Sequence, residues 1–215
     1  MTSTASQWVV VGRCAHWSGQ TGRMAVKAAT VHRLKVTLRG VRPPVWRRVE
    51  VPSTTTLHQL SAELEAAMGW LGGHLHSFDA AGVIYQLPSD DDFGWRPTKD
   101  ERRAVLRTVL PRVKMTMQWD YDFGDGWTHD VTVEAIEPVA DSVTYPRCVT
   151  GRRACPPEDC GGPWGYAELL EALADPAHPE HEAMLEWAPP AFDPAQFDPA
   201  QATEAMRHAE PWDLD

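Results

Sequence analysis

The sequence predicts a single α+β domain: a mostly antiparallel sheet with one long helix after its first hairpin and further helices near the C-terminus. Two observations support this fold class. Apolar and polar residues alternate in pairs of short segments separated by turn-forming residues, which is typical of β-hairpins. Helical spacing of apolar residues occurs after the first of these pairs and again in the C-terminal third.

The first hairpin is predicted over residues 33–51, where two alternating segments flank a proline-containing turn. A helix is expected over residues 56–69, because threonines that can cap it come first and Gly69 can end it. Apolar residues recur there at helical spacing: Leu57, Leu60, Leu64 and Met68. Glu63 and Glu65 are expected to point outward. Further helices are expected near residues 166–173 and 178–187.

A longer alternation covers residues 114–135 and predicts a second hairpin. We expect a three-residue loop at residues 124–126, because this loop pairs Phe123 with Trp127 and keeps apolar residues on one face. His129 then lies on the inward face, opposite a tyrosine.

The outward face of this hairpin carries three aspartates that are candidate catalytic or cation-binding residues. In the predicted register Asp120 opposes Asp130, with Asp122 beside them. Like charges directly opposite destabilise a sheet, so a divalent cation, an arginine or open water should offset them. Glu158 and Asp159, which follow two prolines, are further candidates, either as acid and base or as a helix cap.

Three cysteines downstream suggest a zinc site. Cys148, Cys155 and Cys160 lie in a segment rich in proline and glycine. Zinc prefers four nitrogen or sulfur ligands in a tetrahedron, and the inward-facing His129 is the natural fourth ligand. Two alternatives remain open: the cysteines are small buried residues in a tight loop, or Cys155 is a nucleophile with His129 as its base.

We expect residues 120–130 and residues 146–165 to form one site, because the acidic, aromatic and cysteine residues concentrate in these two segments. His74 and His76 are weaker candidates. Their spacing of two places both on one face of a short strand, a geometry that zinc enzymes use.

The composition argues against a nonspecific nucleic-acid-binding protein, a membrane protein and a secreted protein. The net charge of −10 gives no support to nonspecific nucleic-acid binding, which needs Lys and Arg against phosphate. No apolar run approaches the roughly 20 residues that span a bilayer, and the N-terminus lacks the layout of a signal peptide, so a cytoplasmic protein is expected. We expect a flexible extension over residues 1–30, one domain over residues 31–200 and a loosely held tail over residues 201–215.

Several segments together resemble the plasmid pRiA4b ORF-3-like family, whose members are also labelled insertion-element passenger proteins of TnpR type. The segments are LRGVRPPVWRRVEVP, HLHSF, YDFGDGWTHDVTVE, YPRCVTGRRACPPEDCGGPWGYAELLEAL and FDPAQFD. The resemblance covers roughly residues 31–200. It implies a bacterial α+β domain found on plasmids, insertion elements and chromosomes, and it assigns no reaction.

The sequence therefore leaves two functions open. The first is a non-enzymatic binding or accessory module associated with mobile elements, with a structural zinc site. The alternative is a metal-dependent hydrolase or nuclease that uses His129 and the Asp/Glu cluster. The sequence contains no phosphate-binding loop and no zinc-protease or serine-hydrolase motif that would name a reaction, and it names no partner.

Overall fold

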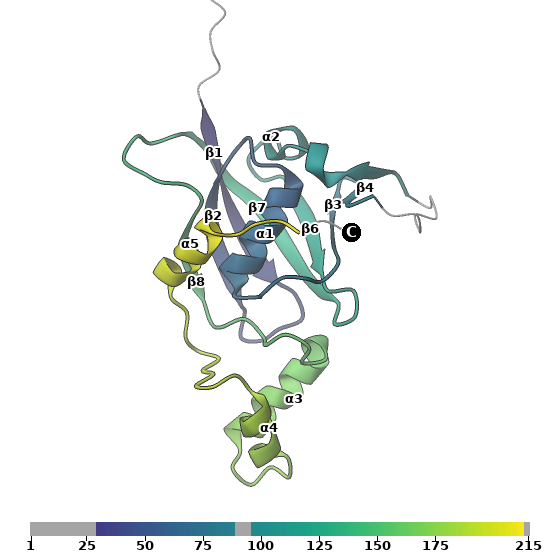
Figure 1. Ribbon diagram of the computed structural model, residues 1–215, viewed down its shortest axis with the longest axis vertical. Coiled ribbons are helices and arrows are strands. Elements are labelled where there is room, and N and C mark those ends of the chain that lie inside the picture. The colour runs from purple at the N-terminus through teal and green to yellow at the C-terminus, as the bar shows by residue number, and fades with distance from the viewer. Residues whose placement is uncertain (1–28, 89–95, 213–215) are drawn as a thin grey trace, which may run out of the picture.

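The computed structural model describes residues 29–88 and 96–212, and within them eight strands form one sheet (Figure 1). Their order is β5-β4-β3-β6-β7-β1-β2-β8, and every neighbouring pair is antiparallel except β4 and β5. The mostly antiparallel sheet is therefore confirmed. The strands are β1 (Thr30–Leu38), β2 (Trp46–Pro52), β3 (His76–Ala80), β4 (Val83–Gln86), β5 (Thr98–Asp100), β6 (Thr116–Tyr121), β7 (Trp127–Pro138) and β8 (Arg147–Arg152).

Helix α1 lies across one face of this sheet, and α5 packs beside α1 and β8 (Figure 1). Helices α3 and α4 form an arm that projects beyond the sheet. The helices are α1 (Leu57–Met68), η1 (Glu101–Arg103, a 3-10 turn), α2 (Leu106–Val109), α3 (Gly162–Ala174), α4 (His181–Trp187) and α5 (Pro199–Arg207). The helix after the first hairpin has 12 residues and α3 has 13, so α1 is not distinguished by its length.

The core lies between α1 and the covered face of the sheet. Leu57, Leu60 and Leu64 of α1 are fully buried there, with the large aromatic residues of β6 and β7. The opposite face of the sheet is polar, as is common when only one side of an antiparallel sheet is covered. Its arginines pair with carboxylates: Arg33 and Arg147 with Glu50, Arg48 with Glu134, and Arg39 with Asp130. These arginines therefore do not form a free basic patch.

The predicted register of the second hairpin is wrong by two residues. Tyr121, rather than Phe123, pairs with Trp127, and residues 122–126 form the loop. The reason lies at Asp122, whose backbone is left-handed and whose carboxylate accepts hydrogen bonds from the amides of Gly124 and Asp125. The side chain thus closes the loop early. A shift of two keeps the side chains within β6 and β7 on their predicted faces, so His129 is still inward and buried. Phe123, predicted to be inward, lies in the loop instead and is 54% exposed.

Glu63 and Glu65 were predicted to point outward, and this prediction is wrong because α1 is covered on more than one side. Helix α5 packs along α1, and Oε1 of Glu65 accepts from the hydroxyl of Ser61 and faces His76 of β3. Each glutamate is only 4% exposed. Burial raises the pKa of both carboxyl groups, that of Glu63 to about 7.

We expect Glu63→Gln to raise the free energy of unfolding by about 1–2 kcal/mol at pH 8 and to change it little at pH 4. Between pH 4.5 and about 7 the carboxyl group of Glu63 is protonated in the native state and ionised in the unfolded chain. The free energy of unfolding of the wild-type protein therefore falls as pH rises through this range. The pKa difference corresponds to roughly 3 kcal/mol, and part of that is retained because an amide also loses water on burial. Urea unfolding at both pH values measures the effect. Glu168→Gln, on an exposed position of α3, should change stability by less than about 0.5 kcal/mol.

The ends of the chain differ from expectation in one respect. Residues 201–207, predicted to belong to a loose tail, form most of α5, where Ala202 and Met206 are buried. The predicted extension over residues 1–30 lies outside the described residues except for its last two. No helix among the described residues has the length and apolar character needed to cross a membrane.

Candidate functional site

The hairpin loop between β6 and β7 meets the loop between β8 and α3, as the sequence predicts. The amide of Gly161 donates to Oδ2 of Asp125 over 3.2 Å, which joins the two loops directly. Trp70, which follows α1, links both to the helix. Its indole nitrogen donates to the carbonyl of Pro156 at 3.0 Å, and its ring stacks on Tyr121 at 4.5 Å.

Glu158 is the centre of this junction. One carboxylate oxygen accepts from the backbone amide of Leu71 at 3.0 Å and from the hydroxyl of Tyr121 at 3.1 Å. The other oxygen is buried and has no hydrogen-bond partner among the described residues. Burial raises the pKa of this carboxyl group. A buried carboxylate oxygen without a donor is unfavourable, and a donor or a positive charge placed against it would offset that cost.

His74 lies beside this free oxygen, between carboxylates on both sides. Its Nδ1 is 3.6 Å from Oδ2 of Asp122, and its Nε2 is 3.9 Å from Glu158 and 4.0 Å from Asp159. His74, Asp122 and Asp159 offer ligand atoms that all lie within 4.8 Å of one another, as a cation site would need. The side chain of Asp159 is 78% exposed, so the group opens to solvent.

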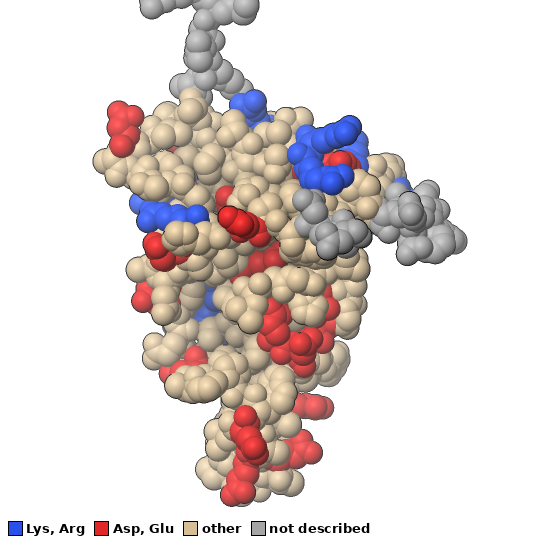
Figure 2. Space-filling view, viewed as in Figure 1, with Lys and Arg blue, Asp and Glu red and all other residues tan. Residues whose placement is uncertain are grey.

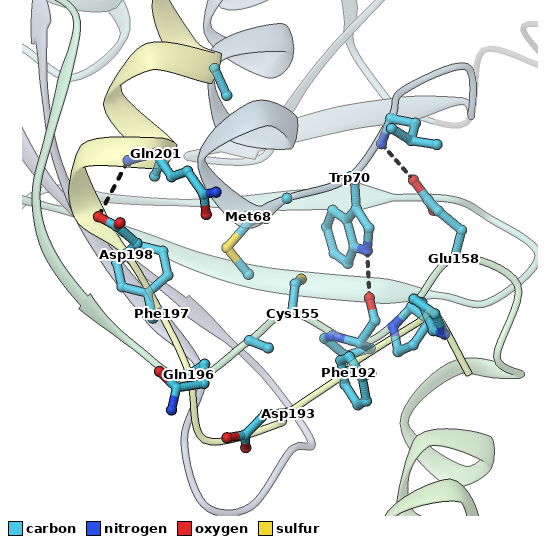
Figure 3. Close-up of a pocket in the computed structure, with 18 of the residues that line it drawn as sticks. Met68, Trp70, Cys155, Glu158, Phe192, Asp193, Gln196, Phe197, Asp198 and Gln201 are labelled. Atoms are coloured by element: carbon cyan, nitrogen blue, oxygen red, sulfur yellow. Dashed lines mark hydrogen bonds between the residues drawn. The ribbon is translucent and has the colours of Figure 1, made fainter. Parts of the chain in front are cut away.

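A cavity of about 1010 Å³ opens next to this junction (Figure 3). It lies between the C-terminal end of α1, residues 154–159 and residues 187–198, with α5 at one side. Its lining is largely apolar and aromatic. The main apolar side chains are Met68, Trp70, Pro156, Pro157, Trp187, Phe192 and Phe197.

The rim of this cleft is acidic. Glu158, Asp159, Asp193 and Asp198 line it, and Figure 2 shows more Asp and Glu than Lys and Arg over the lower half of the same face. Arg47 is the one positively charged residue among the described lining residues, and it is only 1% exposed, with its N–H groups directed at backbone carbonyls. The cleft therefore favours an apolar ligand with positive charge.

The three hairpin aspartates do not form one group. Asp120 accepts from Gln118 and from Thr128 at 2.7 Å, and Asp130 pairs with Arg39 on the polar face of the sheet. Only Asp122 reaches the junction, because its left-handed backbone turns it away from the other two. One cation therefore cannot bind all three carboxylates, and of the alternatives left open an arginine offsets the charge of Asp130.

The predicted zinc ligands are also not brought together. The ligand atoms of Cys148, Cys155, Cys160 and His129 do not form a group within 4.8 Å among the described residues. The sheet order explains this. His129 is on β7 and Cys148 is on β8, with β1 and β2 between them, a separation of roughly 14 Å at about 4.8 Å per strand. One metal cannot bind both residues.

Neither the cysteines nor His129 is placed for nucleophilic catalysis. Burial raises the pKa of the Cys148 thiol to about 11 and that of Cys160 to about 12, and it raises the pKa of Cys155 well above its ordinary value. Burial also lowers the pKa of His129 to about 3. The ring of His129 lies 4.4 Å from that of Trp119, away from the carboxylates of the junction.

Local sequence patterns missed several of these residues. Trp70 carries no motif, and FDPAQFD (residues 192–198) entered only as a segment of the family resemblance, with no role at the site. Both reach the site because α1 and α5 pack together. The spacing of His74 did mark it as a candidate ligand.

Comparisons with known proteins agree on a family. The model of the plasmid pRiA4b ORF-3-like protein family matches residues 30–201. The uncharacterized protein y4hQ of Sinorhizobium fredii is 43% identical over 179 residues, which cover 83% of this chain and 91% of that protein. The crystal structure of MM3350, a protein of unknown function from Methanosarcina mazei Go1, matches with a TM-score of 0.73 and 36% identity. That match covers 81% of this chain and 98% of that one.

Proposed function

Because the chain belongs to the plasmid pRiA4b ORF-3-like family, whose name assigns no activity, we propose its function from its own geometry. It is a non-enzymatic binding module whose cleft holds a peptide segment of a partner protein, in which Lys or Arg lies next to apolar side chains. The observation that carries this proposal is the apolar cleft of about 1010 Å³ with four carboxylates at its rim. The plasmid in the family's name supports an accessory role on a mobile element.

A peptide suits the cleft because apolar surface and acidic side chains lie next to each other there. Trp187 is 46% exposed and Leu71 is 95% exposed, so apolar surface faces the solvent where a partner can cover it. The unpaired oxygen of Glu158 and the exposed Asp159 lie next to this surface. A Lys or Arg side chain of the peptide can place its apolar stem on the apolar surface and its charge beside the two carboxylates.

We expect Trp187→Ala to weaken peptide binding by roughly 30-fold, equivalent to about 2 kcal/mol, because an aromatic anchor at an interface contributes about that much. A phage-displayed library of random peptides supplies the probe, and a selected peptide is then titrated by calorimetry. Trp164→Ala is the matched control, since Trp164 is 85% exposed on α3 and does not line the cleft. The Trp164→Ala variant should bind the selected peptide with unchanged affinity.

The selected sequences test the charge complementarity. Enrichment of Lys and Arg beside apolar residues supports the proposal. Acidic peptides, or no enriched peptide at all, would contradict it. A chain that begins at residue 29 distinguishes a further case: peptides that bind only after this truncation would show that the protein's own N-terminal segment competes for the cleft.

A metal-dependent hydrolase is the second candidate, favoured by the grouping of His74, Asp122 and Asp159 at the mouth of the cleft. His129 has no part in this version, because it is buried away from these carboxylates. Hydrolysis of a phosphodiester or peptide that requires Mg²⁺, Mn²⁺ or Zn²⁺ and is lost in Asp122→Asn would establish it and displace the binding module.

A further inference from the structure

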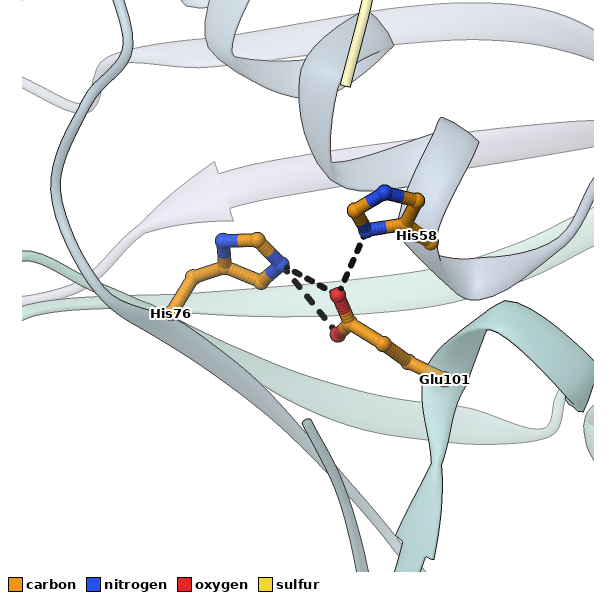
Figure 4. A group of neighbouring side chains, drawn as sticks. All are labelled: His58, His76 and Glu101. Carbon is orange, nitrogen blue, oxygen red and sulfur yellow. Dashed lines mark hydrogen bonds and ion pairs between the residues drawn. The ribbon is translucent and has the colours of Figure 1, made fainter. Parts of the chain in front are cut away.

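A second cluster of titratable side chains lies away from the cleft, beneath the N-terminal end of α1 (Figure 4). His58 from α1 and His76 from β3 both face Glu101 from η1. Nδ1 of His58 is 2.9 Å from a carboxylate oxygen of Glu101, and Nε2 of His76 is 3.0 Å from the same oxygen. All three side chains are buried, and Glu101 is 0% exposed.

We propose that His58, His76 and Glu101 bind one divalent transition-metal ion, with Zn²⁺ as the best fit. The three ligand atoms lie within 4.8 Å of one another. Zinc bonds of about 2.0–2.2 Å place tetrahedral ligands roughly 3.3 Å apart, so Glu101 needs to move from each histidine by only a few tenths of an ångström. Two imidazoles and one carboxylate suit Zn²⁺ and similar ions better than Mg²⁺ or Ca²⁺.

The second ring nitrogen of His76 supports a metal. Nδ1 of His76 is buried without a hydrogen-bond partner among the described residues, and Oε1 of Glu65 is 3.8 Å from it. If His76 is neutral and donates from Nε2 to Glu101, its Nδ1 presents a lone pair towards a second carboxyl group. With a metal on Nε2 the ring proton is on Nδ1, and a small closure of the 3.8 Å gap would let Nδ1 donate a hydrogen bond to Oε1 of Glu65. The second ring nitrogen of a metal-bound histidine almost always donates to a carboxylate, a backbone carbonyl or water.

Glu65 is itself held in place. The hydroxyl of Ser61 donates to Oε1 of Glu65 at 2.8 Å, and the indole nitrogen of Trp119 donates to Ser61 at 3.1 Å. Glu65 also lines a cavity of about 350 Å³ beneath residues 208–212.

Metal analysis of the full chain, purified without a polyhistidine tag, tests the proposal. We expect about one equivalent of Zn²⁺ per chain after incubation with Zn²⁺ and dialysis. Glu101→Gln, which preserves size, should lower the affinity by more than about 100-fold, since loss of an outer partner alone costs about 10–100-fold. Glu65→Gln should fall within that smaller range. Co²⁺ in place of Zn²⁺ should give visible bands without the near-ultraviolet charge transfer of a thiolate ligand.

His74→Ala is the matched control, because His74 belongs to the other group of possible ligands. It should retain the metal. Loss of the metal in His74→Ala with retention in Glu101→Gln would overturn the assignment in favour of the cleft mouth, and a thiolate band would do so in favour of the cysteines. Wild-type protein that holds less than a tenth of an equivalent of Zn²⁺, Co²⁺, Ni²⁺, Mn²⁺ or Fe²⁺ would overturn it without reliance on any variant. The cluster would then be a buried hydrogen-bonded group of two histidines and a glutamate.

Discussion

Replacement of Arg47 by methionine is expected to lower the free energy of unfolding by about 3–4 kcal/mol. Arg47 is on β2, and its guanidinium group is inside the protein at 1% exposure. It has no carboxylate partner among its described contacts. Its donors go instead to four backbone carbonyls, those of Trp46, Ala67, Met68 and Arg152, at 2.8–3.2 Å.

The size of the effect follows from those four acceptors. The carbonyls of Ala67 and Met68 belong to the last turn of α1, where helical partners run out. Methionine fills much of the space but leaves these carbonyls without a donor, and each buried unsatisfied group costs about 1–3 kcal/mol. Relief of the cost of burying a charge offsets part of the loss. The guanidinium also lies 3.7 Å from the ring of Phe197, so the residues lining the cleft should loosen with it.

Arg48→Met is the matched control, since the neighbouring arginine makes a partly exposed ion pair with Glu134 and lies over the ring of Trp46. Its cost should be about 1 kcal/mol or less. Arg47→Lys should recover less than half of the loss, because one ammonium group cannot reach all four carbonyls. Equal midpoints of urea unfolding for Arg47→Met and Arg48→Met would contradict this account.

The role of Arg47 shows why part of the structure could not be predicted from sequence. Period-two alternation correctly placed the faces of β6 and β7, because the face of a strand depends on its own residues. Strand order depends on contacts between distant segments. The sequence therefore offered His129 and Cys148 as ligands of one metal, although β1 and β2 separate them.

The buried cluster beneath α1 also depends on contacts between distant segments, which local sequence patterns do not predict. His58, His76 and Glu101 come from three separate elements, and no spacing within one element brings them together. The contact between the β6–β7 loop and the β8–α3 loop could be predicted from sequence, because both loops have an unusual local composition. The contact between the two loops was predicted, while the residues that meet there changed: Asp122, Glu158 and Asp159 remain, His74 and Trp70 join, and His129 leaves.

The meeting of these two loops depends on Gly162, and Gly162→Ala is expected to cost about 2–4 kcal/mol and to weaken binding at the cleft. A methyl group at this position would overlap the backbone carbonyl oxygen of Asp125 in the hairpin loop. Because the obstacle is backbone rather than a flexible side chain, one of the two loops must move, at roughly 1–3 kcal/mol. The left-handed backbone at Gly162, with φ of +69°, adds about 1 kcal/mol for any residue with a Cβ.

Gly161→Ala separates these two contributions. Gly161 has the same handedness, with φ of +85°, but the nearest atom to an added Cβ is 3.6 Å away. It should therefore show the backbone cost alone, and the difference between the variants measures the contact with Asp125. Urea unfolding and titration of the selected peptide would both be measured. If Gly162→Ala loses stability but binds the peptide as Gly161→Ala does, the junction only supports the fold. If its affinity also falls, the position of Glu158 relative to Tyr121 and His74 determines what the cleft can hold.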